Sequence, residues 1–356
     1  MTITARQWDK YVTSLSRINK KAAELMQTYV DSKGLEDVKG VIDYAYALTT
    51  KYGTAASELA CEMYDECVLL SDLNDKLDKI KAAEPAETAT YAETAKAVNG
   101  SLKQSPMGNL VASTVERLVK QAGADTTLKN ALRDGAFFAW IPHGDTCAFC
   151  LTLASRGWQR ASKRIVKGGH AEHIHANCDC TFAVKFDPFD EVEGYEPDHY
   201  KQLYDLAEGE NSDEKIKSLR RILDKVEIGN DINISENKAE IKNAIWLSET
   251  FGGKVKLLPR DMTKMTPDYE WNGKLWDLKT PVSNTGNSID KLVHHGMKQI
   301  QENAGGIMLN LENNDLDFDT AMNIASRRIQ REKSSHSLGD IKLIVKNKDL
   351  YKVKDI

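Results

Sequence analysis

Residues 140–150 read WIPHGDTCAFC, and residues 173–180 read HIHANCDC. Together they place a CxxC pair, Cys147 and Cys150, ahead of a CxC pair, Cys178 and Cys180, with His175 beside the second pair. Thiolate and imidazole groups at such spacings are preferred ligands of a tetrahedral structural zinc ion. This motif therefore predicts one Zn²⁺, held by Cys147, Cys150 and two of the other three residues. The alternatives are buried free thiols, or two disulfides in an exported protein.

Composition and charge bear on the choice between a metal and disulfides. The chain has 356 residues, six cysteines and a formal net charge of -5, which argues against a protein that coats nucleic acid. The first residues contain no apolar segment typical of a secretory signal, and no apolar run is long enough to span a bilayer. We therefore expect no membrane partner and a reducing cytosol, where cysteines favour metal over disulfides.

The part of the chain before the motif shows helical periodicity. Apolar residues recur at helical spacing from Trp8 to Tyr29 and again over residues 38–73. Ser105 and Pro106 predict a further helix start, as N-cap and first helical residue. These amphipathic helices indicate a packing and assembly scaffold. We expect residues 1–185 to form an all-α module that the Cys/His motif at 140–180 closes.

The second half of the chain changes character twice. Residues 186–234 are acidic and weakly patterned, so we expect a linker there. Beyond it, helical and strand-like runs alternate, and Asn272-Gly273 between two strand-like runs predicts a hairpin. The expected order is helix, three strands, helix, strand, helix and two strands. It describes a small α+β domain over residues 235–356.

Polar residues gather on this hairpin and its flanks. Asp277 and Lys279 are two residues apart on a strand and so face the same side, with Asp268 before them and Thr280 after them. A carboxylate and a lysine can position a phosphodiester and stabilise the charge that develops on it. His295 on the next helix is a candidate general acid or base, because imidazole titrates near neutral pH. The alternatives are a solvated strand face with a surface ion pair, and a surface histidine.

The C-terminal segment resembles a known family. The runs KLLPR (256–260), TPDYEWNGKLWDLKTP (266–281) and IMLNL (307–311) are similar to the C-terminal toxin domain of CdiA-type contact-dependent inhibition proteins. That family resembles the barnase/EndoU/colicin/RelE-like ribonucleases, and its members cleave tRNA. The resemblance implies a tRNA nuclease with Lys279 and Thr280 in its site, and an immunity protein as a partner. It leaves the catalytic histidine unassigned.

The N-terminal segment resembles a second family. The pattern Trp-x-Pro-x-x-Asp-x-Cys-x-x-Cys, followed by His-x-x-Cys-x-Cys, looks like the MuF-type minor head proteins of tailed phages, over roughly residues 1–185. Those proteins contact the portal and the capsid interior during head assembly. The resemblance implies a location in the bacterial cytoplasm during assembly and in the virion head afterwards. Some such head proteins carry a C-terminal effector domain, which agrees with the first resemblance.

Three functions follow from these patterns. The preferred hypothesis is a phage minor head protein with a C-terminal endoribonuclease that acts on tRNA without a bound metal. The second is a metal-dependent nuclease, because Pro267-Asp268 followed by Asp277-x-Lys279 fits the PD-(D/E)xK spacing. In such a site both carboxylates bind Mg²⁺ and the lysine orients the attacking water or stabilises its charge. The third is a purely structural head protein whose last domain only docks.

Overall fold

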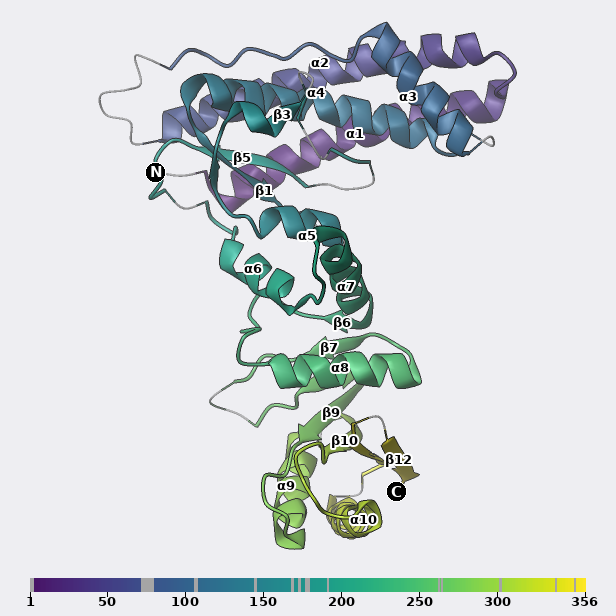
Figure 1. Cartoon of the computed structure of the whole chain (residues 1–356), viewed down its shortest axis with the longest axis vertical. Coiled ribbons are helices and arrows are strands. Elements are labelled where there is room, and N and C mark those ends of the chain that lie inside the picture. Colours follow the sequence, from purple (N-terminus) through teal and green to yellow (C-terminus); the bar gives the residue numbers. More distant parts are fainter. Residues whose placement is uncertain are drawn as a thin grey trace. The chain divides into compact units, whose positions relative to one another are not determined.

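The computed structural model describes residues 3–71, 80–105, 108–143, 146–167, 170–171, 174–176, 180–190, 192–261, 263, 265–300, 303–336, 338–348 and 350–356. The chain divides into two compact units, Met1–Lys201 (unit 1) and Gln202–Ile356 (unit 2). Figure 1 labels their helices and strands. No helix in these ranges is long and apolar enough to cross a bilayer.

Four long helices make up most of the described part of unit 1. They are α1 (Ala5–Lys33), α2 (Val38–Leu70), α3 (Tyr91–Gln104) and α4 (Val111–Asp134). Capping boxes at Thr4 and Thr90 start α1 and α3 by satisfying backbone N–H groups that lack helical partners. Helix α4 lies against the other three and is buried on nearly every side. At Gly123 the backbone of Ala56 comes so close that an added Cβ would lie 3.3 Å from its carbonyl oxygen.

The helical character predicted for the N-terminal region is confirmed, but the module is not all-α, because residues 137–185 add two small antiparallel sheets. The helix start predicted at Ser105 is wrong, because Ser105 is the C-cap of α3, while α4 begins at Val111. Pro106, which was expected to be the first residue of that helix, lies outside the described residues.

Short elements complete unit 1. They are β1 (Phe137–Ile141), α5 (Ala148–Ala154), β2 (Gln159–Arg160), η2 (Lys163–Ile165), β3 (Val166–Lys167), β4 (His170–Ala171) and β5 (Thr181–Lys185). Strand β1 pairs antiparallel with β2 and β5, and β3 pairs with β4. Phe182 on β5 packs against the rings of Phe138 and Trp140 on β1. This small sheet therefore carries an aromatic cluster that α4 partly covers.

Unit 2 is built around a mixed seven-stranded sheet. Helix α6 (Pro197–Leu206) spans the unit boundary. The elements that follow are α7 (Ser212–Lys225), β6 (Val226–Glu227), α8 (Lys238–Phe251), β7 (Val255–Leu257), β8 (Tyr269–Trp271), β9 (Lys274–Lys279), α9 (Gly286–Gln299), β10 (Ala304–Asn310), α10 (Phe318–His336), β11 (Lys342–Asn347) and β12 (Leu350–Asp355). The strand order is β12-β11-β10-β9-β8-β7-β6. Strands β9, β10 and β11 run parallel, whereas β7, β8 and β9 are antiparallel neighbours.

The two faces of this sheet are covered differently. Helices α9 and α10 pack on one face, where Val293, Ile307 and Leu343 belong to a fully buried apolar cluster. Helix α8 contacts the other face, where Lys346 Nζ donates a 3.0 Å hydrogen bond to Asn243 Oδ1 and Tyr269 donates to the carbonyl of Glu240. The parallel strands β10 and β11 are therefore buried along most of their length, whereas the edge strand β12 is exposed.

Unit 2 differs from the predicted C-terminal domain in its fold class and in the residue at which it begins. Its crossover helices and parallel strands make it an α/β unit with a mixed sheet, where the sequence predicted a small α+β domain. The hairpin predicted at Asn272-Gly273 is confirmed, and both residues have positive φ angles, as a two-residue turn demands. Residues 186–234, predicted as a linker, contain α6, α7 and β6. Strand β6 pairs with β7 and so adds an edge to the sheet.

Candidate active site

Asp277 and Lys279 lie on β9, in the middle of the sheet, on the face that α9 covers. The side chain of Asp277 is fully buried, and that of Lys279 is 14% exposed. The ammonium nitrogen of Lys279 lies 2.5 Å from Oδ2 of Asp277. Among the described residues, neither carboxylate oxygen of Asp277 accepts a hydrogen bond of good geometry. The pair is therefore an ion pair that leaves acceptor capacity unused inside the protein.

Asp268 brings a second carboxyl group to the same place. It immediately precedes β8, and its Oδ2 accepts a 2.7 Å hydrogen bond from the backbone N–H of Leu278. Burial raises the pKa of Asp277 well above its usual range, and the nearby charge of Asp268 raises it further, while Lys279 opposes both effects. A carboxyl pair that shares one buried site in this way is typical of functional centres.

Two residues of α9, Gln299 and Gly296, bring this helix into contact with Asp277 and Lys279. Gln299 Oε1 accepts a 2.7 Å hydrogen bond from Lys279 Nζ, and Gln299 Nε2 donates to the carbonyl of Thr266. Gly296 lies one turn earlier, and a Cβ there would be 2.6 Å from Oδ2 of Asp277. Neither residue was predicted as part of the site. Their three-residue spacing, with a glycine on an otherwise apolar helix face, is the signal that identifies them.

The other two predicted catalytic residues lie differently. Thr280 is exposed directly after β9, at the end of the strand that carries the ion pair. His295 is exposed on α9, and its ring centroid lies 6.0 Å from that of His294, which pairs with Glu332 at 2.6 Å. The structure thus brings Asp268, Asp277 and Lys279 together. No contact described in this structure links His295 to them.

The donor set favours a hard divalent cation. Asp268 and Asp277 offer carboxylate oxygens, which are the ligands that Mg²⁺ prefers. The buried oxygens of Asp277, which have only the Lys279 ammonium and the Asp268 carboxyl beside them, are the atoms that a cation would satisfy. The ammonium of Lys279 beside them can stabilise negative charge on a phosphate or a water-derived nucleophile. The residues present therefore fit the two-acid-and-lysine arrangement of metal-dependent nucleases.

The residues predicted to bind zinc lie in unit 1. The ligand atoms of Cys147, Cys150 and His175 lie within 4.8 Å of one another. Cys180 is buried just before β5, with its sulfur 3.8 Å from Thr146 Oγ1, and Cys178 lies outside the described residues. Within the described residues the structure therefore shows a three-residue Cys/His cluster, and not a four-ligand zinc motif that closes the module.

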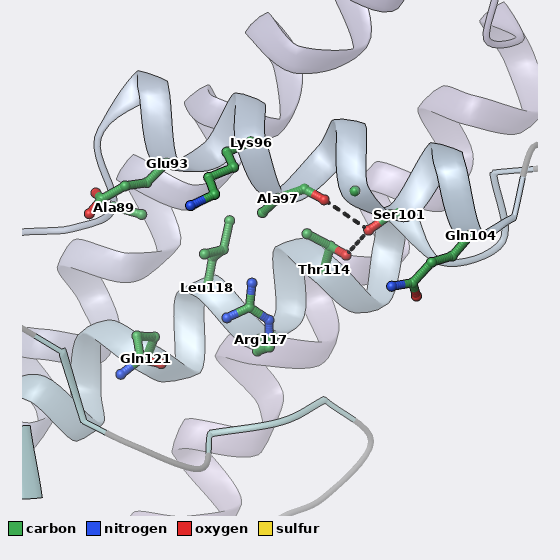
Figure 2. Close-up of a pocket in the computed structure, with 11 residues that line it drawn as sticks. Ala89, Glu93, Lys96, Ala97, Ser101, Gln104, Thr114, Arg117, Leu118 and Gln121 are labelled. Atoms are coloured by element: carbon green, nitrogen blue, oxygen red, sulfur yellow. Dashed lines mark hydrogen bonds between the residues drawn. The ribbon is translucent and has the colours of Figure 1, made fainter. Parts of the chain in front are cut away.

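Unit 1 also contains a pocket of about 500 Å³ between α3 and α4. Figure 2 shows Lys96 and Arg117 at its walls, with a hydrogen bond between Ser101 and Thr114 at one end. Burial lowers the pKa of Arg117. The residues that line the pocket include no acid pair like Asp268 and Asp277, so its shape alone does not make it a reaction centre.

Comparisons with known proteins match two separate segments of the chain, one mostly in unit 1 and one within unit 2. A family model described as "VG15 protein" matches residues 2–207, and one described as "Contact-dependent growth inhibition CdiA C-terminal domain" matches residues 264–350. The second match contains Asp268, Asp277 and Lys279. No curated protein matches the chain.

A solved structure titled "CdiA-CT/CdiI toxin and immunity complex from Burkholderia pseudomallei" is 19% identical. It covers 36% of this chain and 94% of its own, with a TM-score of 0.25. The VG15 match spans more than half of the 356 residues. The chain therefore belongs to the phage-associated VG15 protein family.

Proposed function

We propose that this protein is a phage-associated protein whose C-terminal unit is a toxin nuclease, with Asp268, Asp277 and Lys279 as its reaction centre. The observation that carries the proposal is the buried carboxylate of Asp277, which has a second acid and a lysine beside it. These three residues lie inside the segment that matches the CdiA C-terminal domain model. A buried acid in such surroundings reduces stability, which supports its having a role in function.

The residues divide the chemistry of phosphodiester cleavage between them. Asp268 and Asp277 would hold a divalent cation such as Mg²⁺, which when bound supplies Lewis-acid polarisation and lowers the pKa of a water molecule. Lys279 would stabilise charge on the scissile phosphate, and Gln299 keeps its ammonium group in place. Helix α9 limits access of bulk water to the pair, because Gly296 lies directly over Asp277.

This geometry favours a cation-assisted nuclease over the metal-independent ribonuclease that the sequence alone favours. The metal-independent reaction needs a general acid or base near Lys279, and His295 was the candidate. His295 is exposed and its ring lies 6.0 Å from that of His294, whereas Lys279 pairs with Asp277, which has Asp268 beside it. The acids, and not the histidine, are therefore the residues that we assign to the reaction. Thr280, at the open end of β9, remains a candidate for contact with the phosphate.

For the substrate we propose RNA, and tRNA first. The support is the resemblance of residues 256–311 to CdiA-type toxins, whose members cleave tRNA. For the N-terminal unit we propose a place in the virion head, in contact with portal and capsid proteins, after assembly in the bacterial cytoplasm. The VG15 match supports this proposal. A nuclease made inside the producing cell would damage that cell, so we also propose an immunity protein as a partner.

The test uses the full chain with a tRNA pool, single-stranded DNA and duplex DNA, each with Mg²⁺ and with excess EDTA. We expect RNA fragments only in the presence of Mg²⁺ and none from the Asp277→Asn variant. Asp340→Asn removes the same charge from a carboxylate that is 98% exposed, and should cleave normally. Cleavage that persists in EDTA would contradict the cation-assisted mechanism. Intact RNA and DNA under all conditions would contradict the nuclease assignment.

A further inference from the structure

We propose that Cys147, Cys150 and His175 bind one structural zinc ion, which joins the start of α5 to the segment that precedes β5. The three ligand atoms converge although His175 is 25 residues beyond Cys150 in the sequence. This site lies in unit 1 and is independent of the proposed reaction centre in unit 2.

The distances between the ligand atoms are close to those around a tetrahedral zinc ion, with one sulfur–nitrogen distance slightly short. Cys150 Sγ lies 3.1 Å from His175 Nε2, and Cys147 Sγ lies 3.8 Å from the same nitrogen. Zinc binds sulfur at about 2.3 Å and nitrogen at about 2.0 Å, so tetrahedral ligands are roughly 3.3 to 3.8 Å apart. The cluster therefore has room for an ion at its centre with small side-chain adjustments.

The imidazole of His175 is oriented for this role. Its Nδ1 lies 3.1 Å from the carbonyl oxygen of Ala176, an acceptor, so this contact favours the tautomer with the proton on Nδ1 and the lone pair of Nε2 toward the two sulfurs. Zinc-binding histidines are commonly held by such a hydrogen bond from the second ring nitrogen. The ring of Phe149 packs edge-on against the imidazole at 5.5 Å and limits its rotation.

The backbone supplies the other half of the site. Cys147 is the N-cap of α5 and Cys150 lies in its first turn, so their three-residue spacing places both sulfurs on one side of the helix. A Cys147–Cys150 disulfide is the competing state of this pair. It would leave the converging Nε2 of His175 without a function, whereas a zinc ion uses all three groups.

The consequence is a structural role. Zinc would replace weak thiol–imidazole contacts with metal–ligand bonds, and its binding free energy would then add to folding. Two described protein thiols and one imidazole leave one position of a tetrahedron for a further ligand. Cys180, buried nearby and in contact with Thr146, is the described thiol that we would test for that position.

The experiment measures metal content in the purified full-length protein, prepared under reducing conditions. We expect one zinc per chain, retained by Cys61→Ser, whose thiol lies on α2, and lost in Cys150→Ser and His175→Ala. Because these variants could misfold, Co²⁺ is also added to metal-depleted wild type, where thiolate ligation gives an intense near-ultraviolet charge-transfer band. X-ray absorption then counts the sulfur ligands, and Cys180→Ser tests the fourth position. Absence of bound zinc, Co²⁺ without a thiolate band, or a Cys147–Cys150 disulfide would overturn the proposal.

Discussion

The carboxyl group of Asp277 is fully buried, and burial disfavours its ionised form. Its nearest cation, Lys279, is shared with Gln299, and a second acid lies beside it. The raised pKa means that the folded protein retains a proton on Asp277 at pH values where the unfolded chain has released it. Stability from this group is therefore fully present below the ordinary aspartate pKa, and is lost as pH rises through the folded-state pKa.

The Asp277→Asn variant tests this electrostatic account. Asparagine has nearly the same shape and no charge to desolvate, so unit 2 should become more stable by about 1 to 3 kcal/mol at pH 8. Near pH 4 wild type is protonated and the difference should shrink. Thermal melting of both proteins from pH 4 to pH 8 measures this gap. A constant gap across the series, or a variant that is less stable at pH 8, would show that Asp277 is not a strained buried acid.

Gly296 allows α9 to approach the acid–lysine pair, and Gly296→Ala tests how closely. The new Cβ would lie 2.6 Å from Asp277 Oδ2 and 2.8 Å from Ile307 Cδ1, so these buried side chains or the helix must shift. We expect a loss of about 1 to 3 kcal/mol in unfolding free energy and weaker RNA cleavage. Gly100→Ala, where a Cβ meets no atom within 4 Å, is the control and should stabilise α3 by about 0.5 to 1 kcal/mol. Wild-type melting and cleavage in Gly296→Ala would mean that the contact is unimportant.

The sequence allowed only part of the candidate site to be predicted. Asp277 and Lys279 follow from the two-residue period of a strand, and Asp268 from its place before the hairpin. Gln299 and Gly296 depend on how α9 docks on the sheet, which local periodicity does not determine. The alternative of a solvated strand face is wrong for the same reason, because α9 covers Asp277 and Lys279. His295 shows that a titratable residue on the right helix can still lie on the wrong face.

At the scale of the elements, local sequence signals predicted turns correctly, whereas the pairing of distant strands could not be predicted. The Asn272-Gly273 turn was predictable because two adjacent residues with positive φ angles favour Asn and Gly. The parallel pairing of β9, β10 and β11 was not, since it joins strands that are separated by whole helices. Strand β6 has only two residues, too few to show an alternating pattern, and so the sequence does not indicate this edge of the sheet.

The edge elements lead to a prediction about where unit 2 begins. Leu219 and Ile222 of α7, and Val226 of β6, are buried, so a fragment that starts at residue 235 would expose their partners. We expect the fragment 202–356 to fold, and the fragment 235–356 to melt at a clearly lower temperature or to aggregate. Circular dichroism melting of both fragments measures this. Equal melting temperatures would show that the C-terminal domain begins at residue 235, as the sequence predicts.

At the scale of the whole molecule, two units with separate cores carry the two family matches. Their separation predicts two unfolding transitions in calorimetry of the full chain. If Cys147, Cys150 and His175 bind zinc as proposed, its removal should lower only the transition of unit 1, and Asp277→Asn should raise only that of unit 2, because each change lies inside one unit. A single transition that responds to both changes would show that the units unfold together.

The central claim is that the charged group on β9 cleaves phosphodiester bonds, and the most direct measurement is the rate of tRNA cleavage by the full chain in Mg²⁺ with and without Lys279. Lys279→Ala should reduce the rate by about a hundred- to a thousand-fold, because it removes the group that stabilises developing charge. Lys354→Ala removes the same charge from an exposed site on β12 and should leave the rate unchanged, provided that melting confirms both variants are folded. Full activity in Lys279→Ala, or an equal loss in Lys354→Ala, would contradict the assignment.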